Sequence, residues 1–194
     1  MQRLRGQEVE VLLHSGAPGD ELLLFRAMRD AGWQPRMVIG TTGGYGLAET
    51  ARSLGDALLG AMSAELASFA VNEAYAPGAR AFAEAYLRRY GAAPRSGHSL
   101  AAHVGCRLFL DALHRAGGPE KEKLRAALLA LDLPEGSTAA GWGARFDDRG
   151  QNLRARPLLC QWQPGAQGAG QGLVQVTVHP AAAAVAPVIT RLGT

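Results

Sequence analysis

The stretch Gly143-Ala-Arg-Phe-Asp-Asp-Arg-Gly-Gln-Asn152, followed by Leu158-Leu-Cys-Gln-Trp162, decides the fold of this chain. Asp147, Asp148 and Gly150 are residue types that form tight turns, so they predict a hairpin after a short strand at 144–146. Leu158–Trp162 is a short apolar run that predicts a buried strand, and Leu173–Val178 predicts another. The chain therefore closes with a β-rich region.

Strands alternate with helices before this region. Strands are expected at 8–14, 37–39 and 61–66. Between them, Leu24, Ala27, Met28 and Ala31 recur at the spacing of one helical face, and 47–54 reads as a short helix. This order predicts an α/β fold with a parallel sheet and right-handed crossovers.

The middle of the chain is expected to be helical. Helices are predicted at 77–90, at 99–116 with Ser99 as N-cap, and at 119–131 with Pro119 in the first turn. The i, i+4, i+8 spacing of Phe82, Tyr86 and Tyr90 predicts packing into a core.

Composition and charge exclude several classes of protein. The chain has 194 residues, of which 47% are hydrophobic and 19% charged, as in globular domains. Its 20 basic residues are scattered without a basic run, which argues against nucleic-acid binding. No run of 18 apolar residues is present, so no membrane-spanning segment is expected. Cys106 and Cys160 are either two buried thiols or, in an exported protein, a disulfide.

The N-terminal residues lack the apolar stretch and cleavage site of a signal peptide. Two localisations follow as expectations. The chain is cytoplasmic if expressed as given, and extracytoplasmic if it is part of a longer, exported protein.

The glycine-rich segment Gly40-Thr-Thr-Gly-Gly-Tyr-Gly46 lies between a strand and a helix. It allows three interpretations: a connecting turn, a loop that contacts a small molecule, or the phosphate loop of a Rossmann-like nucleotide-binding enzyme at Gly43–Gly46. The nucleotide fingerprint is incomplete, because Glu49 stands where its third glycine belongs.

Motifs of catalysis and metal binding are absent from the sequence. No Gly-x-Ser-x-Gly, His-Glu-x-x-His or Cys-x-x-Cys pattern occurs, and helix capping explains Ser96-Gly-His98 better than a catalytic pair. We therefore expect no enzyme, no metal site and no cofactor.

Several motifs in fixed order resemble the type I periplasmic binding proteins of the leucine/isoleucine/valine branch. They include Arg29-Asp-Ala-Gly32, Gly55-Asp-Ala-Leu-Leu-Gly60, the pattern Phe82-x-x-x-Tyr-x-x-x-Tyr-Gly91, Asp111-Ala-Leu-His-Arg-Ala-Gly117 and the hairpin Phe146-Asp-Asp-Arg-Gly150. The resemblance runs from about Val9 to Val178, and it covers only the C-terminal half of that family.

The resemblance implies a partial parallel-sheet sandwich of the type I kind. It assigns residues 8–75 to the α/β second lobe, residues 76–135 to a helical crossing segment that packs on the first lobe, and residues 136–180 to a β-rich hinge return. Residues 181–194 are expected as a disordered tail. Without the first lobe, the apolar faces of helices 99–116 and 119–131 are expected to be exposed and to favour association.

The function implied is the substrate-binding component of an ABC importer for branched-chain or other amino acids or small polar solutes. Its partners would be the solute and an ABC permease. By position in the resemblance, the ligand-binding residues are Ser15, Gly16, Ala17, Thr41, Thr42, Tyr45 and His103.

Overall fold

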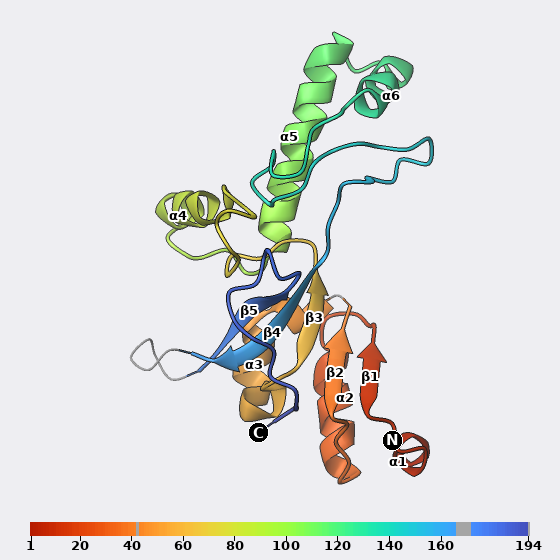
Figure 1. The fold of residues 1–194 in the computed structure, drawn as a ribbon, viewed down its shortest axis with the longest axis vertical. Coiled ribbons are helices and arrows are strands. Elements are labelled where there is room, and N and C mark those ends of the chain that lie inside the picture. Colours follow the sequence, from red (N-terminus) through yellow and green to blue (C-terminus); the bar gives the residue numbers. More distant parts are fainter. Residues whose placement is uncertain (42, 166–171, 194) are drawn as a thin grey trace. The chain divides into compact units, whose positions relative to one another are not determined.

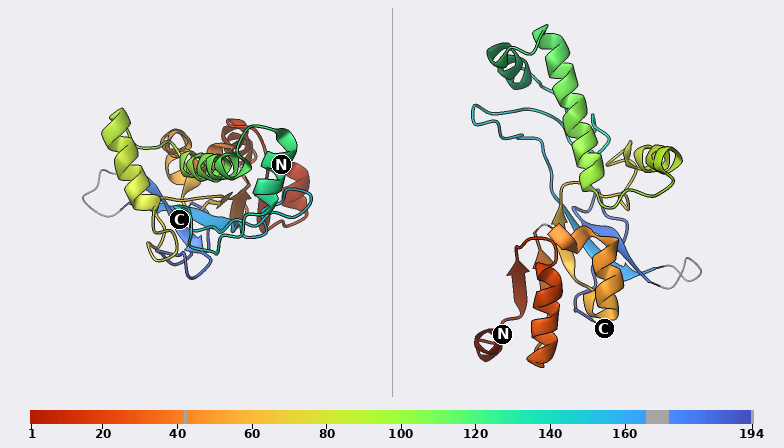
Figure 2. Two further views of the ribbon diagram at one scale, coloured as in Figure 1. Left: turned by 90° about the horizontal axis from the view of Figure 1, so that it is seen from above. Right: turned by 180° about the vertical axis from the view of Figure 1, so that it is seen from behind.

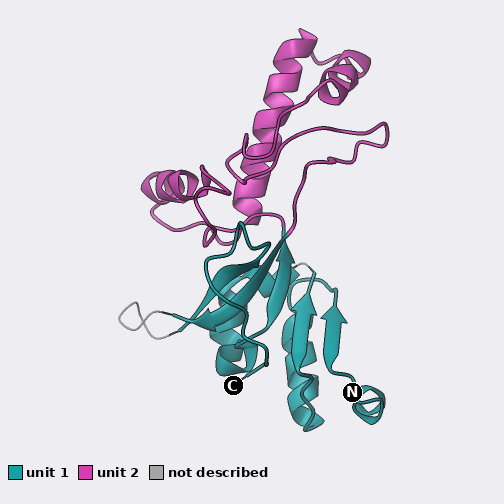
Figure 3. Ribbon diagram, in the orientation of Figure 1, with its two compact units in different colours: residues 1–65, 158–194 teal, residues 66–157 magenta. Residues whose placement is uncertain are grey.

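The computed structural model describes residues 1–41, 43–165 and 172–193. They form two compact units (Figure 3). Unit 1 contains residues 1–65 and 158–194, and unit 2 contains residues 66–157. The three segments that the resemblance assigns, 8–75, 76–135 and 136–180, remain predictions, since this division groups residues by contact alone.

Unit 1 is a five-stranded sheet in the order β1-β2-β3-β4-β5 (Figure 1). The first three strands are parallel, whereas β4 pairs antiparallel with β3 and β5 antiparallel with β4. Helices α2 and α3 lie on the same face of the sheet (Figures 1 and 2). The α/β class and the parallel β-α-β-α-β part are confirmed. The elements of unit 1 are α1 (Gln2–Gly6), β1 (Val11–His14), α2 (Asp20–Asp30), β2 (Met37–Gly40), η1 (Gly43–Gly46), α3 (Ala48–Leu54), η2 (Gly55–Leu58), β3 (Met62–Glu65), β4 (Leu158–Pro164) and β5 (Leu173–His179).

The core of unit 1 is a cluster of apolar side chains from both ends of its sequence. Residues of α2, β2 and η2 pack with Trp162 of β4 and Leu192. The register of β3 and β4 pairs Met62 with Gln161, so the C-terminal strands extend the sheet that the N-terminal segment begins. The buried members of this cluster are Leu24, Phe25, Met28, Val38, Tyr45, Ala51, Leu58, Ala61, Trp162 and Leu192.

The expected disordered tail is wrong for residues 181–193. Leu192 is buried, its N–H donates to Arg36 O, and its carbonyl accepts a hydrogen bond from Gln34 Nε2. The buried Gln161 amide bonds both the N–H and the carbonyl of Ile189. An alanine-rich composition does not reveal such pairing, because the partners, the side-chain amides of Gln34 and Gln161 and the Arg36 carbonyl, lie elsewhere in the sequence.

Unit 2 contains three helices: α4 (Ala79–Tyr90), α5 (His98–Ala116) and α6 (Lys121–Leu129). The helix expected from Ser99 begins one residue earlier, and His98 N–H donates to Ser96 Oγ, so Ser99 is not the N-cap. Helix α6 begins two residues after Pro119. Isolated bridges replace the strand expected at 144–146. One of them joins Phe146 to Asn152 and closes the predicted hairpin.

The aromatic row on α4 is not a core. The ring of Phe82 contacts that of Tyr86, and the ring of Tyr86 contacts that of Tyr90. The Tyr90 side chain, however, is exposed. Their spacing predicts one helical face correctly, and the described part of unit 2 has no sheet to cover that face. Neither cysteine forms a disulfide in the structure; Cys160 is buried and Cys106 is exposed, so the buried-thiol interpretation is wrong for Cys106.

Among the described residues, no helix is long and apolar enough to cross a membrane.

Candidate functional site

Two turns follow β1 and β2, at the carboxyl ends of parallel neighbouring strands. In the first turn Ser15 and Ala17 are exposed, and in the second Thr41 is exposed. Thr41 N–H donates to the His14 carbonyl, so the second turn starts directly beside the first. The two turns touch, because a Cβ added to Gly43 would lie 3.1 Å from Gly16 O. The structure therefore brings the residues predicted from the two segments into one place.

The first turn is held by the start of α2. Asp20 Oδ2 accepts a hydrogen bond of 2.8 Å from Ala17 N–H, and Asp20 N–H donates to Ala17 O. A Cβ on Gly16 would lie 2.6 Å from Asp20 Oδ2, so a side chain at this position would break the arrangement. Gly16 therefore allows the close approach of Asp20 that holds the turn.

Tyr45 supports the second turn from within. It is only 2% exposed, and its hydroxyl lies 2.8 Å from His14 Nδ1. Its ring packs where a Cβ of Gly40 would be, and its carbonyl accepts a hydrogen bond from Trp162 Nε1. The structure therefore places Tyr45 between the core and the turn, with its hydroxyl already bonded.

Two carboxylates lie beneath the glycine-rich turn. Glu21 is buried and accepts hydrogen bonds from Gly19 N–H and Thr50 Oγ1. A Cβ on Gly44 would lie 1.7 Å from Glu21 Oε1, and one on Gly46 would lie 2.6 Å from Glu65 Oε1. Burial, together with the nearby Glu21 charge, raises the pKa of the Tyr45 hydroxyl well above its ordinary value. The turn therefore packs closely against two carboxyl groups on its inner side.

Two of the predicted site residues stand apart from this place. Thr42 lies outside the described residues. His103 belongs to unit 2, where it is exposed on α5 with its ring centroid 5.0 Å from that of Phe82.

Sequence reasoning missed Glu21 as a member of the site. A signal was present, because Glu21 precedes Leu24 by three positions and Met28 by seven, and so continues the buried stripe of α2. A carboxylate on an apolar stripe indicates a specific buried partner.

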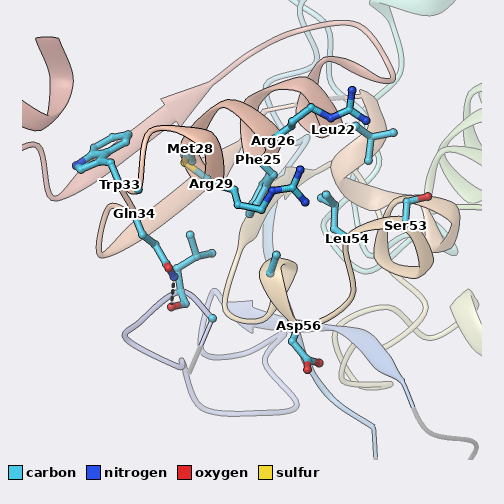
Figure 4. Close-up of a pocket in the computed structure, with 14 residues that line it drawn as sticks. Leu22, Phe25, Arg26, Met28, Arg29, Trp33, Gln34, Ser53, Leu54 and Asp56 are labelled. Carbon is cyan, nitrogen blue, oxygen red and sulfur yellow. Dashed lines mark hydrogen bonds between the residues drawn. The ribbon is translucent and has the colours of Figure 1, made fainter. Parts of the chain in front are cut away.

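A separate cavity of about 590 Å³ lies on the helix side of unit 1 (Figure 4). Its floor is apolar, with Phe25, Met28 and Leu192 among the lining residues, and Arg29 and Asp56 also line it. The lining segments 32–34 and 56–57 precede β2 and β3, so this cavity is at the amino ends of the strands. Ligands of open α/β sheets bind at the carboxyl ends, so the two turns remain the candidate site.

Comparison with known proteins decides the family. Residues 1–171 match the family model described as periplasmic binding protein. The chain belongs to the periplasmic binding protein family. It is 37% identical over 186 residues to Leu/Ile/Val-binding protein homolog 7 of Brucella suis biovar 1 (strain 1330). It is 38% identical over 184 residues to homolog 8 of Brucella abortus (strain 2308).

These alignments include 95% and 94% of this periplasmic binding protein chain, but 45% and 44% of the two relatives. The chain therefore spans a little under half the length of the curated relatives it matches. The resemblance to the C-terminal half of the family agrees with this partial coverage.

Solved structures show the same fold. An ABC transporter substrate-binding protein from Sphaerobacter thermophilus superposes with a TM-score of 0.70 at 22% identity, over 100% of this chain and 49% of that one. A putative branched-chain amino acid ABC transporter from Silicibacter pomeroyi gives 0.68 at 20% identity, over 100% and 50%. A fatty acid ABC transporter substrate-binding protein from Thermomonospora curvata gives 0.66 at 18% identity, over 100% and 49%. Proteins described with different solutes share this fold, so the fold does not name the ligand.

Proposed function

We propose that this chain is part of the substrate-binding component of an ABC importer, for branched-chain or other amino acids or small polar solutes. The observation that carries the proposal is the pair of contacting turns at the carboxyl ends of β1 and β2, in a chain that belongs to a solute-binding family. In the full-length protein, an ABC permease would be the partner and the compartment would be extracytoplasmic.

Within this proposal, the ligand contacts on unit 1 are Ser15, Gly16, Ala17, Thr41 and Thr42, and a role for His103 stays a prediction from the sequence alone. Tyr45 would act through the turn that it supports, because its hydroxyl is bonded to His14. The contacts offer hydroxyl and backbone groups, which suit the polar end of a solute. They include no carboxylate to pair with the ammonium group of an amino acid.

The Rossmann-like nucleotide interpretation of Gly43–Gly46 is not favoured. A phosphate loop offers unopposed backbone N–H groups and a positive potential to the ligand. Here the inner side of the turn faces the carboxyl groups of Glu21 and Glu65, which repel a polyphosphate. The family match supports a binding protein over an enzyme.

The chain alone is expected to bind its solute poorly. Three or four neutral hydrogen bonds contribute about 0.5–1.5 kcal/mol each to binding. A ligand loses roughly 4 kcal/mol or more of translational and rotational free energy on binding, so little net affinity is left. Calorimetry with leucine, isoleucine and valine should therefore give dissociation constants weaker than about 1 mM. Micromolar binding would show that the chain forms a complete site without further polypeptide.

The location of the site is tested by NMR titration of the 194-residue chain with leucine at tens of millimolar, about ten times the expected limit. We expect amide shifts confined to residues 15–17 and 41–45, with smaller shifts in a Ser15→Ala/Thr41→Val variant. Ser53→Ala is the matched control, because Ser53 is exposed on α3 and its hydroxyl donates to Glu49 O. Shifts from ATP or NAD at this turn, with none from amino acids, would contradict the proposal.

A further inference from the structure

One buried carboxyl group binds the starts of both helices that follow the two turns of the candidate site. Glu21 lies in the first turn of α2 and is 3% exposed. Its Oε2 accepts a hydrogen bond of 2.9 Å from Gly19 N–H, in the stretch that leads from the first turn into α2. Its Oε1 accepts a hydrogen bond of 3.0 Å from Thr50 Oγ1, near the start of α3. The two oxygens of one side chain therefore join α2 to α3.

The same carboxyl group also meets the second turn directly. Gly44 has no room for a Cβ, because that atom would overlap Glu21 Oε1. The chain runs from Gly44 into α3 through Leu47, whose carbonyl accepts hydrogen bonds from Thr50 N–H and Ala51 N–H. Glu21 therefore contacts the second turn at Gly44 and the helix that follows it at Thr50.

We propose that Glu21 is a positioning residue of the candidate site. It holds the turn at 15–18 and the turn at 43–46 in the arrangement in which Gly43 packs against Gly16 O. Because Glu21 is buried, it acts on a solute through the two turns and does not contact the solute itself. This inference rests on the proposed function, since the two turns are the ligand contacts that the proposed function assigns to unit 1.

A carboxylate suits this position because two donors converge on it. Both of its oxygens accept hydrogen bonds, and it brings no N–H or O–H that would need a partner of its own. A methionine of similar length would leave Gly19 N–H and the Thr50 hydroxyl without their acceptor, which costs more than a hydrogen bond contributes when it is made. A glutamine keeps one acceptor, so it should restore part of what methionine removes.

A double-mutant cycle tests whether Glu21 meets the second turn. Glu21→Asp shortens the side chain, so in the parent chain it should weaken both hydrogen bonds and lower the urea midpoint of unfolding. In a Gly44→Ala background the shorter side chain makes room for the added methyl group, so the same change should leave the midpoint unaltered or raise it. Gly105→Ala is the matched control background, because Gly105 has no atom within 4 Å of its Cβ position, and there the midpoint should fall as in the parent. An equal fall in the Gly44→Ala background would overturn the proposal.

NMR titration with leucine at tens of millimolar tests the consequence for the ligand contacts, at the concentration set by the expected weak binding. Glu21→Met should lose most of the leucine-induced amide shifts at 15–17 and 43–46, although no contact residue is changed, and Glu21→Gln should recover part of them. Met28→Leu is the matched control, since Met28 is buried on the same face of α2 about two helical turns further on. Circular dichroism checks that the variants are folded.

The two experiments separate this inference from the proposed function. Leucine-induced shifts of parental size in Glu21→Met would overturn the positioning role and leave the site in place. An absence of leucine-induced shifts in the parent chain would contradict the proposed function instead. The urea cycle alone would then decide whether Glu21 holds the second turn against α2.

Discussion

Unit 1 and unit 2 bury their apolar residues to different extents. Unit 1 has a continuous core built from α2, β2, η2, β4 and the C-terminal segment. In unit 2, α4 buries Ala79 alone among its residues, α6 buries none, and Phe109 and Leu110 of α5 are exposed. The comparison teaches that similar helical patterns do not imply similar burial, because a helix buries its apolar face only where another layer covers it. Of the apolar face expected to be exposed on α5, Phe109 is exposed but Val104 is buried.

Matched leucine deletions should show the largest difference between the units. Leu58 of η2 is fully buried in unit 1, whereas Leu110 is exposed in unit 2. Leu58→Ala should lower the free energy of unfolding by about 2–5 kcal/mol, and Leu110→Ala should change it by less than about 0.5 kcal/mol. Urea unfolding followed by circular dichroism measures both. Equal losses would show that α5 packs in a core as tight as that of unit 1.

Two glycine-to-alanine substitutions should have opposite signs. Gly44→Ala places a methyl group against Glu21, whose carboxylate is fixed by Gly19 and Thr50, and should destabilise unit 1 by about 1–3 kcal/mol. Gly105→Ala on α5 meets no atom within 4 Å and should stabilise the helix by about 0.5–1 kcal/mol. Thermal melts of the two variants measure this difference. Stabilisation by Gly44→Ala would contradict the buried position of Glu21.

The loss of stability at alkaline pH should arise in part from Tyr45 of unit 1. Burial raises the pKa of the Tyr45 hydroxyl in the folded state. Its contribution to the free energy of unfolding is therefore fully present below the unfolded-state pKa of about 10. Above that pH the unfolded state releases the proton first, and stability falls by up to about 1.4 kcal/mol per pH unit. Tyr45→Phe should reduce this alkaline loss while costing about 1 kcal/mol at neutral pH through the lost hydrogen bond to His14. Urea titrations at pH 7 and pH 11 measure both effects, and an unchanged alkaline slope in the variant would show that Tyr45 is not the group responsible.

Local patterns were sufficient to predict most elements of the fold. The apolar stripe of α2 and the strands around it were predicted because their partners are near in sequence. The antiparallel pairing of β3 with β4 was not predicted, because it joins residues almost a hundred positions apart and depends on register. The same limit applies to Leu192, which completes a core begun by Leu24.

The candidate site was predicted in part. Ser15, Ala17 and Thr41 were predicted from the family resemblance, and their meeting in one place agrees with the rule that parallel strands end at one edge of a sheet. The inward position of Tyr45 does not, because it depends on the space left by Gly40 and on the His14 side chain. Their ligand roles remain predictions.

Native-state amide hydrogen exchange of the 194-residue chain tests the contrast between the two units most directly. We predict strong protection in β2, β3 and β4, approaching that of global unfolding, and much weaker protection in α4 and α6, since protection depends on burial and packing. Protection in α4 and α6 equal to that of β2 would contradict the account, because it would show that these two helices are packed as closely as the central strands of unit 1.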